Sequence, residues 1–125
     1  LRLDPGLALV RANLGGLLAQ LGRIPEALAH FRSALRLRPD DASLHYNFGL
    51  ALSLAGQGDI AAGHYRTALR LRPGHADTHV NYANLLFARG QFAAAETHYR
   101  TALRLSPGHP QAIQGLASVL ASRPR

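Results

Sequence analysis

Residues 61–73, AAGHYRTALRLRP, decide the fold, because this stretch occurs three times at a constant interval. Residues 27–39 (ALAHFRSALRLRP) match it at 9 of 13 positions, and residues 95–107 (AETHYRTALRLSP) match it at 10 of 13. Prolines repeat with the same 34-residue period, at Pro5, Pro39, Pro73 and Pro107. A chain of 125 residues with this period is expected to be one array of similar units.

Each period is predicted to hold two amphipathic helices. Apolar side chains recur at helical spacing, as at Ala27, Phe31 and Ala34. Gly22, Gly56 and Gly90 stand where the first helix needs a left-handed residue, and the periodic prolines end the second helix. Helix starts are expected at residues suited to a first turn or cap, namely Pro25, Pro110, Asp40 and Asp41 before Ala42, and Asp59 before Ile60.

These residues resemble the tetratricopeptide repeat family. The match runs through Leu14, Gly15, Leu18, Ala27, Phe31, Ala34 and Pro39 and through the residues one and two periods later. The resemblance covers the whole chain and is nearest to the repeats of O-linked N-acetylglucosamine transferases and bacterial members. It implies an all-α, right-handed superhelical solenoid of antiparallel helix pairs.

The same resemblance implies a single domain over residues 1–125. Residues 1–7 are expected to be the tail of a preceding repeat, 8–41, 42–75 and 76–109 full repeats, and 110–125 the first helix of a fourth. Small residues at Gly15, Gly49 and Ala83 should let paired helices touch, with Phe31, Tyr65 and Tyr99 filling the space beside them. The family's early Trp position holds Arg11, His45 and His79, which is expected to weaken packing there.

First helices line the concave groove in this family, so the groove is the predicted binding surface. Its candidate partner-binding residues are Asn13, Asn47, Asn81, Tyr46, Leu50, Asn84 and Phe87. The three asparagines in register are predicted to bond a peptide backbone, with Tyr46 and Phe87 as anchors. The alternative is that the asparagines only cap or solvate the groove and the aromatic side chains pad the seams between repeats.

The distribution of charged residues argues against two binding functions, a carboxylate clamp and nucleic-acid binding. A clamp for a terminal carboxylate needs cations, but the matching positions hold Ala12, Gly16, Asn47, Asp77 and Asn81. All 14 cationic residues are Arg against 7 acidic residues. Pairs four residues apart predict a basic stripe on the convex side, at Arg32 and Arg36, Arg66 and Arg70, and Arg100 and Arg104, joined by Arg2, Arg38 and Arg72. A solvated face is the simpler interpretation, and nucleic acid is not expected as a partner, because neither interleaved aromatic residues nor a nucleic-acid motif accompanies the stripe.

Catalysis and metal binding are not expected. The chain has no Cys, and His30, His64 and His98 are one position copied three times, too far apart to share a metal ion. His75 and His79 are close in sequence but have no evident third ligand. No cofactor, phosphate loop or catalytic triad is predicted.

The predicted function is therefore a cytoplasmic protein-interaction scaffold that binds a peptide or partner protein. Two alternatives stay open: the substrate-presenting part of a larger enzyme such as a glycosyltransferase, and self-association through terminal helices. The second rests on apolar residues expected to lack a partner, Ile113, Leu116, Val119 and Leu120. Because the sequence has no Met and starts inside a motif, it is expected to be a segment of a longer protein, and no stretch is apolar enough for a membrane span.

Overall fold

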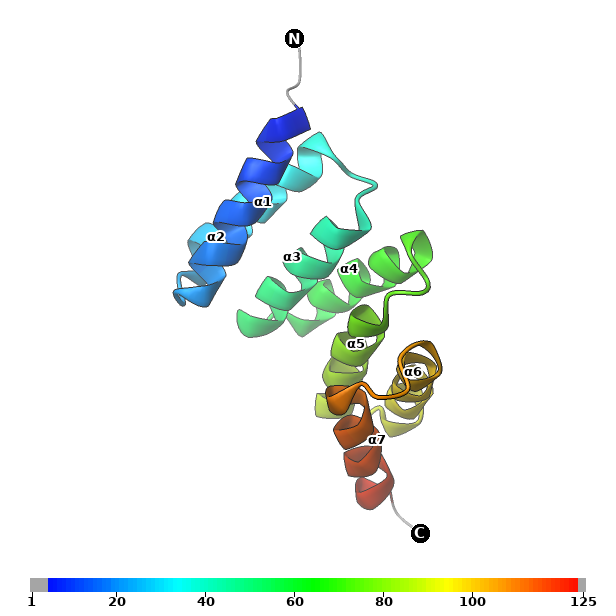
Figure 1. The fold of residues 1–125 in the computed structure, drawn as a ribbon. Helices are drawn as coiled ribbons and strands as arrows, with labels where there is room; N and C mark the ends of the chain where they lie inside the picture. Colours follow the sequence, from blue (N-terminus) through cyan, green and yellow to red (C-terminus); the bar gives the residue numbers. More distant parts are fainter. Residues whose placement is uncertain (1–4, 124–125) are drawn as a thin grey trace. The chain divides into compact units, whose positions relative to one another are not determined.

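A computed structural model describes residues 5–123, so Arg2, the rest of residues 1–4 and residues 124–125 lie outside the described residues. Within that range the chain forms seven α-helices (Figure 1): α1 (Pro5–Gln20), α2 (Ile24–Leu37), α3 (Ala42–Leu54), α4 (Gly58–Leu71), α5 (Ala76–Ala88), α6 (Phe92–Leu105) and α7 (Pro110–Ser122). They divide into two compact units, residues 1–71 with α1 to α4 and residues 72–125 with α5 to α7. The predicted repeat boundaries stay predictions.

The turns inside the three helix pairs share one geometry, which confirms the predicted role of the periodic glycines. Gly22, Gly56 and Gly90 have φ values of 78°, 78° and 76°, a region that disfavours residues with a side chain. In the first turn the Arg23 N–H donates to the Leu18 carbonyl at 2.9 Å. The same 2.9 Å bond recurs one and two periods later, from Gln57 to Leu52 and from Gln91 to Leu86. These bonds satisfy carbonyls that the ending helix leaves without partners.

Helix starts follow the predicted signals in three of four cases. Pro25 and Pro110 lie in the first turns of α2 and α7, where the missing N–H costs nothing. Asp41 caps α3 by accepting from the Leu44 N–H at 3.2 Å. The prediction for Asp59 is wrong, because α4 already begins at Gly58 and Asp59 lies inside its first turn. Its carboxylate still lies at the helix end that favours negative charge.

In the first unit, α1 packs on α2, α3 packs on α4, and α2 joins the pairs through α3. Aromatic rings fill the space beside glycines, as predicted. A Cβ on Gly15 would lie 3.0 Å from the Phe31 ring, and one on Gly49 would lie 2.8 Å from the Tyr65 ring. Both rings are almost fully buried. Burying one such side chain contributes on the order of 2 kcal/mol, which makes these contacts a main part of each pair's stability.

In the second unit, α5 packs on α6 and α7 covers both. Val119 on α7 is fully buried, together with Ala112. The expectation that Val119 lacks a partner is therefore wrong, because α7 turns this side chain inward. Ile113 and Leu120, in contrast, are 50% and 46% exposed, and Leu116 is half-buried.

Candidate functional site

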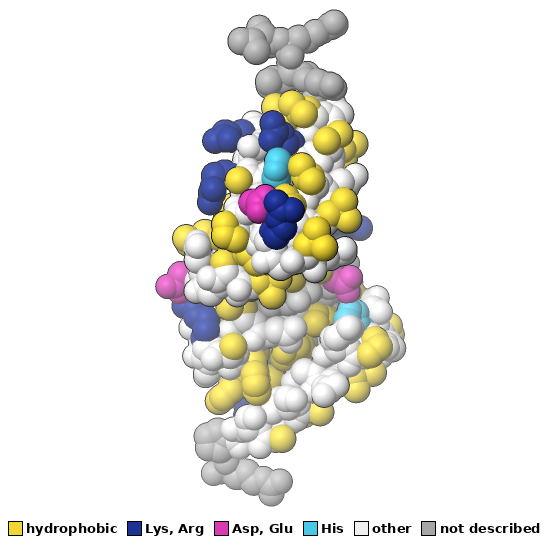
Figure 2. Space-filling model, turned by 90° about the vertical axis from the view of Figure 1, so that its left-hand side faces the viewer, with side chains coloured by type: hydrophobic (Ala, Val, Ile, Leu, Met, Phe, Trp, Pro, Cys, Tyr) yellow, Lys and Arg dark blue, Asp and Glu magenta, His cyan; other side chains and the backbone are white. Residues whose placement is uncertain are grey.

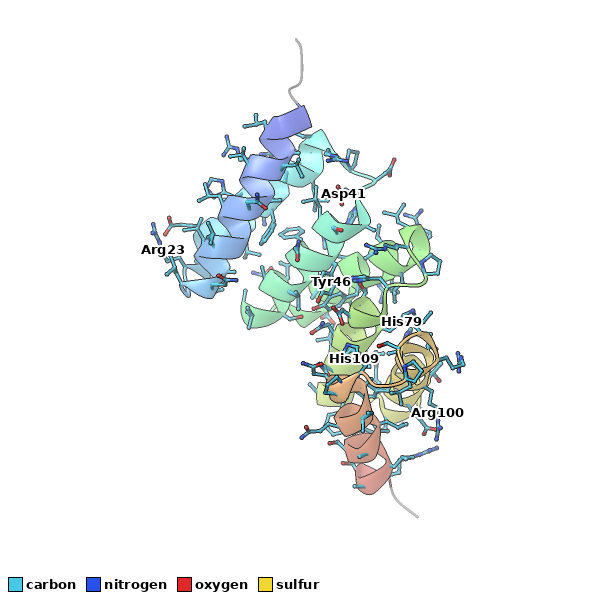
Figure 3. All side chains as sticks on the ribbon, in the orientation of Figure 1. Arg23, Asp41, Tyr46, His79, Arg100 and His109 are labelled. Atoms are coloured by element: carbon cyan, nitrogen blue, oxygen red, sulfur yellow. The ribbon has the colours of Figure 1, made fainter. Side chains whose placement is uncertain are left out.

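The first unit carries four of the predicted binding residues. Asn13 is exposed on α1, and Tyr46, Asn47 and Leu50 are half-buried on α3. Figure 3 shows Tyr46 near the middle of α3. Residues at 46 and 50 are one helical turn apart, so Tyr46 and Leu50 share a face of α3. The helix α1 also contacts α3, so Asn13 and Asn47 occupy neighbouring helices of this unit.

The second unit brings two predicted residues together in a pocket. Asn84 and Phe87, one turn apart on α5, line a cavity of about 280 Å³. The other lining residues come from α6 and α7: Tyr99, Gln111, Gln114, Gly115 and Ser118. The lining therefore combines aromatic surface with amides and a hydroxyl, and none of its side chains carries a formal charge. Such a surface can hold an apolar side chain and hydrogen-bond the neighbouring peptide groups.

Two contacts fix the shape of this pocket. The Tyr99 hydroxyl donates to the side-chain oxygen of Asn84, and both residues line the pocket. Burial raises the pKa of Tyr99, so the hydroxyl keeps the proton that it donates. Phe87 meets Phe92 at a ring-centroid distance of 5.3 Å and an interplanar angle of 55°. Both pocket-forming side chains of α5 are thus positioned before any ligand binds, which lowers the entropy cost of binding.

Asn81 is placed differently from Asn84. Its side-chain amide donates to the Asp77 carbonyl of the same helix at 2.9 Å. Asp77 in turn pairs with His109, whose Nε2 lies 2.7 Å from the carboxylate. Figure 3 labels His109 at the start of α7. The pocket lining does not include Asn81, and the ladder of Asn13, Asn47 and Asn81 stays a prediction.

Sequence reasoning missed a set of histidine contacts. Nδ1 of His45 on α3 lies 3.0 Å from Nδ1 of His64 on α4, and the rings stack with centroids 5.3 Å apart. His79 and His98 repeat this pairing between α5 and α6 at the same two distances. His45 and His79, which stand at the family's early Trp position and were expected to weaken packing, are therefore each packed against a histidine of the facing helix. The signal was present as a 19-residue separation of two histidines in two successive repeats.

The Arg residues of the second helices are exposed, as predicted for a stripe. Figure 2 shows cationic side chains grouped over the α1–α2 hairpin, beside exposed apolar ones. Arg32 lies over the Phe48 ring at 5.7 Å, and Arg36 donates to Ser33. In α6 the charge is partly offset, because Arg100 pairs with Glu96 at 2.8 Å and Arg123 pairs with the same carboxylate. Exposed pairs of this kind contribute little to stability.

Metal binding and membrane crossing find no support in the described part of the chain. Between residues 5 and 123, no three side chains of His, Asp or Glu come together in a way that would hold a metal ion. Among the same residues, every helix is too short or too polar to cross a bilayer.

Comparisons with known proteins agree on one family. A family model described as "TPR repeat" matches residues 15–56, and one described as "Tetratricopeptide repeat" matches residues 46–110. No curated protein sequence matches the chain.

Solved structures match the fold over nearly the whole chain. One is the first repeat domain of Spaghetti (RPAP3) bound to the HSP90 peptide SRMEEVD, with a TM-score of 0.91, 20% identity and coverage of 96% of this chain and 95% of that one. The Arabidopsis OM64 domain has a TM-score of 0.92 at 14% identity, with 95% and 98% coverage. The second domain of human RPAP3, in complex with the HSP70 peptide SGPTIEEVD, has a TM-score of 0.87 at 19% identity, with 94% and 98% coverage. These likenesses confirm the predicted all-α fold of helix pairs.

Proposed function

Since this chain belongs to the tetratricopeptide repeat family, we propose that it is a protein-interaction scaffold that binds an extended peptide segment of a partner protein. The pocket between α5 and α7 is the observation that carries this proposal. It offers the aromatic face of Phe87 beside amide groups, a combination suited to one apolar side chain and its flanking peptide bonds. The proposal gives the chain no catalytic role.

The chemistry of the pocket favours an uncharged segment. Two of the similar structures hold acidic peptides, SRMEEVD and SGPTIEEVD. In the second unit of this chain, the positions that would clamp a carboxylate hold Asp77 and Asn81, and Asp77 carries the same charge as such a ligand. We therefore propose a neutral partner segment with an apolar residue for the pocket. In the first unit, Asn13, Tyr46, Asn47 and Leu50 are the proposed contacts.

A selected peptide tests this proposal. Peptides would be selected from a random display library on the chain, and the best binder would be titrated by fluorescence anisotropy, with SRMEEVD as the acidic comparison. Removing an aromatic anchor commonly costs about 1 to 2 kcal/mol or more, so Phe87→Ala should weaken binding roughly tenfold. Gln114→Ala should remove about 0.5 to 1.5 kcal/mol if its amide bonds the peptide.

The matched control is Leu105→Ala, which truncates an exposed apolar side chain of α6 outside the pocket lining. It should leave affinity unchanged. Equal affinity of the original chain, Phe87→Ala and Gln114→Ala would refute the pocket as the binding site. Tighter binding of SRMEEVD than of the selected neutral peptide would refute the proposed partner class.

Self-association is a second candidate, favoured by the outer face of α7. Ile113 and Leu120 are seven residues apart, share that face and are about half exposed. Exposed apolar side chains in a group are a common contact surface between copies. Sedimentation velocity on the chain and on Leu120→Glu would show concentration-dependent association in the first and not in the second. A chain that stays monomeric at high concentration would contradict this candidate. A cytoplasmic location and a role within a larger enzyme stay predictions.

A further inference from the structure

The contact between His45 and His64 has a defined direction of hydrogen bonding. Nε2 of His45 lies 2.7 Å from the Pro39 carbonyl oxygen, which can only accept, so this nitrogen carries a hydrogen. A neutral His45 then has a lone pair on Nδ1, and Nδ1 of His64, 3.0 Å away, donates to it. The result is a relay from α4 through α3 to the chain segment before α3.

The second unit contains the same relay. Nε2 of His79 donates to the Pro73 carbonyl at 2.8 Å, and Nδ1 of His98 lies 3.0 Å from Nδ1 of His79. Figure 3 labels His79 on α5. Two copies in separate compact units have the same geometry, so the relay follows from the repeated sequence and not from packing particular to one unit.

The first helix pair shows the contrasting arrangement. There Arg11 stands at the position of His45 and His79, and its guanidinium lies 3.3 Å from Nδ1 of His30. An Arg keeps its charge at any pH that a folded protein meets. The α1–α2 pair therefore has one histidine where the next two pairs have two, and it supplies a control within the same chain.

The relays are partly shielded from water. His64 meets the Phe48 ring edge-on at 4.6 Å, and His98 meets the Tyr82 ring at 4.8 Å. Charged groups lie beside each relay. In the first unit these are Arg32 of α2, over the Phe48 ring, and the Arg38–Asp41 pair at the start of α3.

The charged and titratable neighbours in the second unit lie at the start of α5 and α7. His75 bonds Thr78, and Asp77 pairs with His109 of α7. Arg72 precedes the helix, and its charge lowers the pKa of His75, after the larger effect of burial. The Asp77 carboxylate is engaged with its partner His109.

We propose that each histidine relay is a pH-sensitive contact between the two helices of its hairpin, kept while at most one ring is charged and broken when both are. A first proton can bind Nε2 of His64 and leave its donated bond intact. A second proton has to occupy Nδ1 of His45, the acceptor of that bond. Two N–H groups on two cationic rings would then face each other across 3.0 Å.

The direction of the pH effect follows from the burial of the rings. Burial, and secondly the facing ring, lower the pKa of His64 and of His98. The unfolded chain has the ordinary value of about 6.5 and therefore binds more protons than the folded chain just below that pH. Stability that depends on the neutral rings of His64 and His98 is thus present above about pH 6.5 and is lost as the pH falls through their lowered folded values.

The experiment compares thermal unfolding between about pH 7.5 and about pH 5 for three proteins: the original chain, the double variant His64→Gln/His98→Gln and the control His30→Gln. A glutamine amide can donate or accept, so it suits either charge state of the facing ring. In the original chain and the control, the unfolding temperature should fall on the order of 5 °C over this range. In the double variant, the decrease in unfolding temperature should be at most half as large.

Histidine NMR titrations of the original chain supply a readout that needs no folded variant. The ring signals of His64 and His98 should titrate at lower pH than free histidine, and amide signals at the α3–α4 and α5–α6 contacts should shift with them. Titration of both rings at or above the free value would overturn the proposal. So would an equal pH-dependent fall in the double variant and in His30→Gln.

Discussion

Tyr65 and Tyr99 hold the same position in successive repeats and each lies against a glycine, but the two glycines belong to different helices. Tyr65 on α4 lies against Gly49 of α3, its own hairpin partner, where a Cβ would come within 2.8 Å of the ring. Tyr99 on α6 lies against Gly115 of α7, the following helix, where a Cβ would collide with it. Its hydroxyl also bonds Asn84 of α5. Tyr65 is therefore packed against a glycine of its own hairpin, whereas Tyr99 joins α5, α6 and α7.

This difference shows that a glycine on a facing helix determines where an aromatic ring can pack. An aromatic ring occupies the space that the neighbouring backbone leaves open, because interiors are packed with few voids. In the second unit that space lies under Gly115, so Tyr99 becomes part of both the core and the pocket wall. Substitutions at the two tyrosines and at Gly115 distinguish the two kinds of packing.

Truncating either ring should cause the largest loss of stability. Tyr65→Ala and Tyr99→Ala should each cost about 3 to 5 kcal/mol, as for other large aromatic residues in cores. Urea unfolding, followed by circular dichroism, measures the loss. Arg70→Ala, an exposed position on α4, is the control and should change stability by less than about 0.5 kcal/mol. A Tyr variant as stable as the Arg70 variant would contradict the assigned packing.

Adding a methyl group beside Tyr99 should cost less. Gly115→Ala forces the Tyr99 ring or α7 to move, which should destabilise the second unit by about 1 to 3 kcal/mol. Gly63→Ala is the matched helical control, since nothing lies within 4 Å of a Cβ there. It should stabilise the chain by about 0.5 to 1 kcal/mol, because alanine is the better helix former. Changes of the same sign at both glycines would show that Tyr99 does not rest on Gly115.

The hydroxyl of Tyr99 should have the smallest effect of the three. Tyr99→Phe removes the bond to Asn84 and should cost about 0.5 to 1.5 kcal/mol. A double-mutant cycle with Asn84→Ala isolates the bond, and a coupling energy of similar size is expected. Additive losses in the cycle would mean that the two side chains do not interact in solution.

The fold could be predicted because its determinants repeat within each period. Glycines at 22, 56 and 90 mark the turn inside each hairpin, and the prolines at 39, 73 and 107 mark the end of its second helix. The inward position of Val119 could not be predicted in this way. Apolar residues at 113, 116, 119 and 120 span more than one face, and the rotation of α7 on α6 decides which of them is buried. Rotation about a helix axis depends on tertiary packing and leaves little trace in one sequence.

The candidate site was predictable in part for a similar reason. Asn84 and Phe87 follow from the register of first helices, and both line the pocket. Gln111, Gln114 and Ser118 were missed because their contribution depends on how α7 approaches α5. The histidine pairs were missed because the 34-residue period relates each histidine only to its own copies, whereas its partner lies 19 residues away on the facing helix.

The left-handed glycine turns also bear on how quickly the chain can fold. Each turn returns the second helix at once onto the first, so residues that pack together, such as Gly49 and Tyr65, lie close along the chain. Proteins dominated by contacts of short sequence separation fold faster than those that must close long loops. A ribosome that releases this sequence would thus deliver another hairpin able to form its own contacts with every 34 residues it adds.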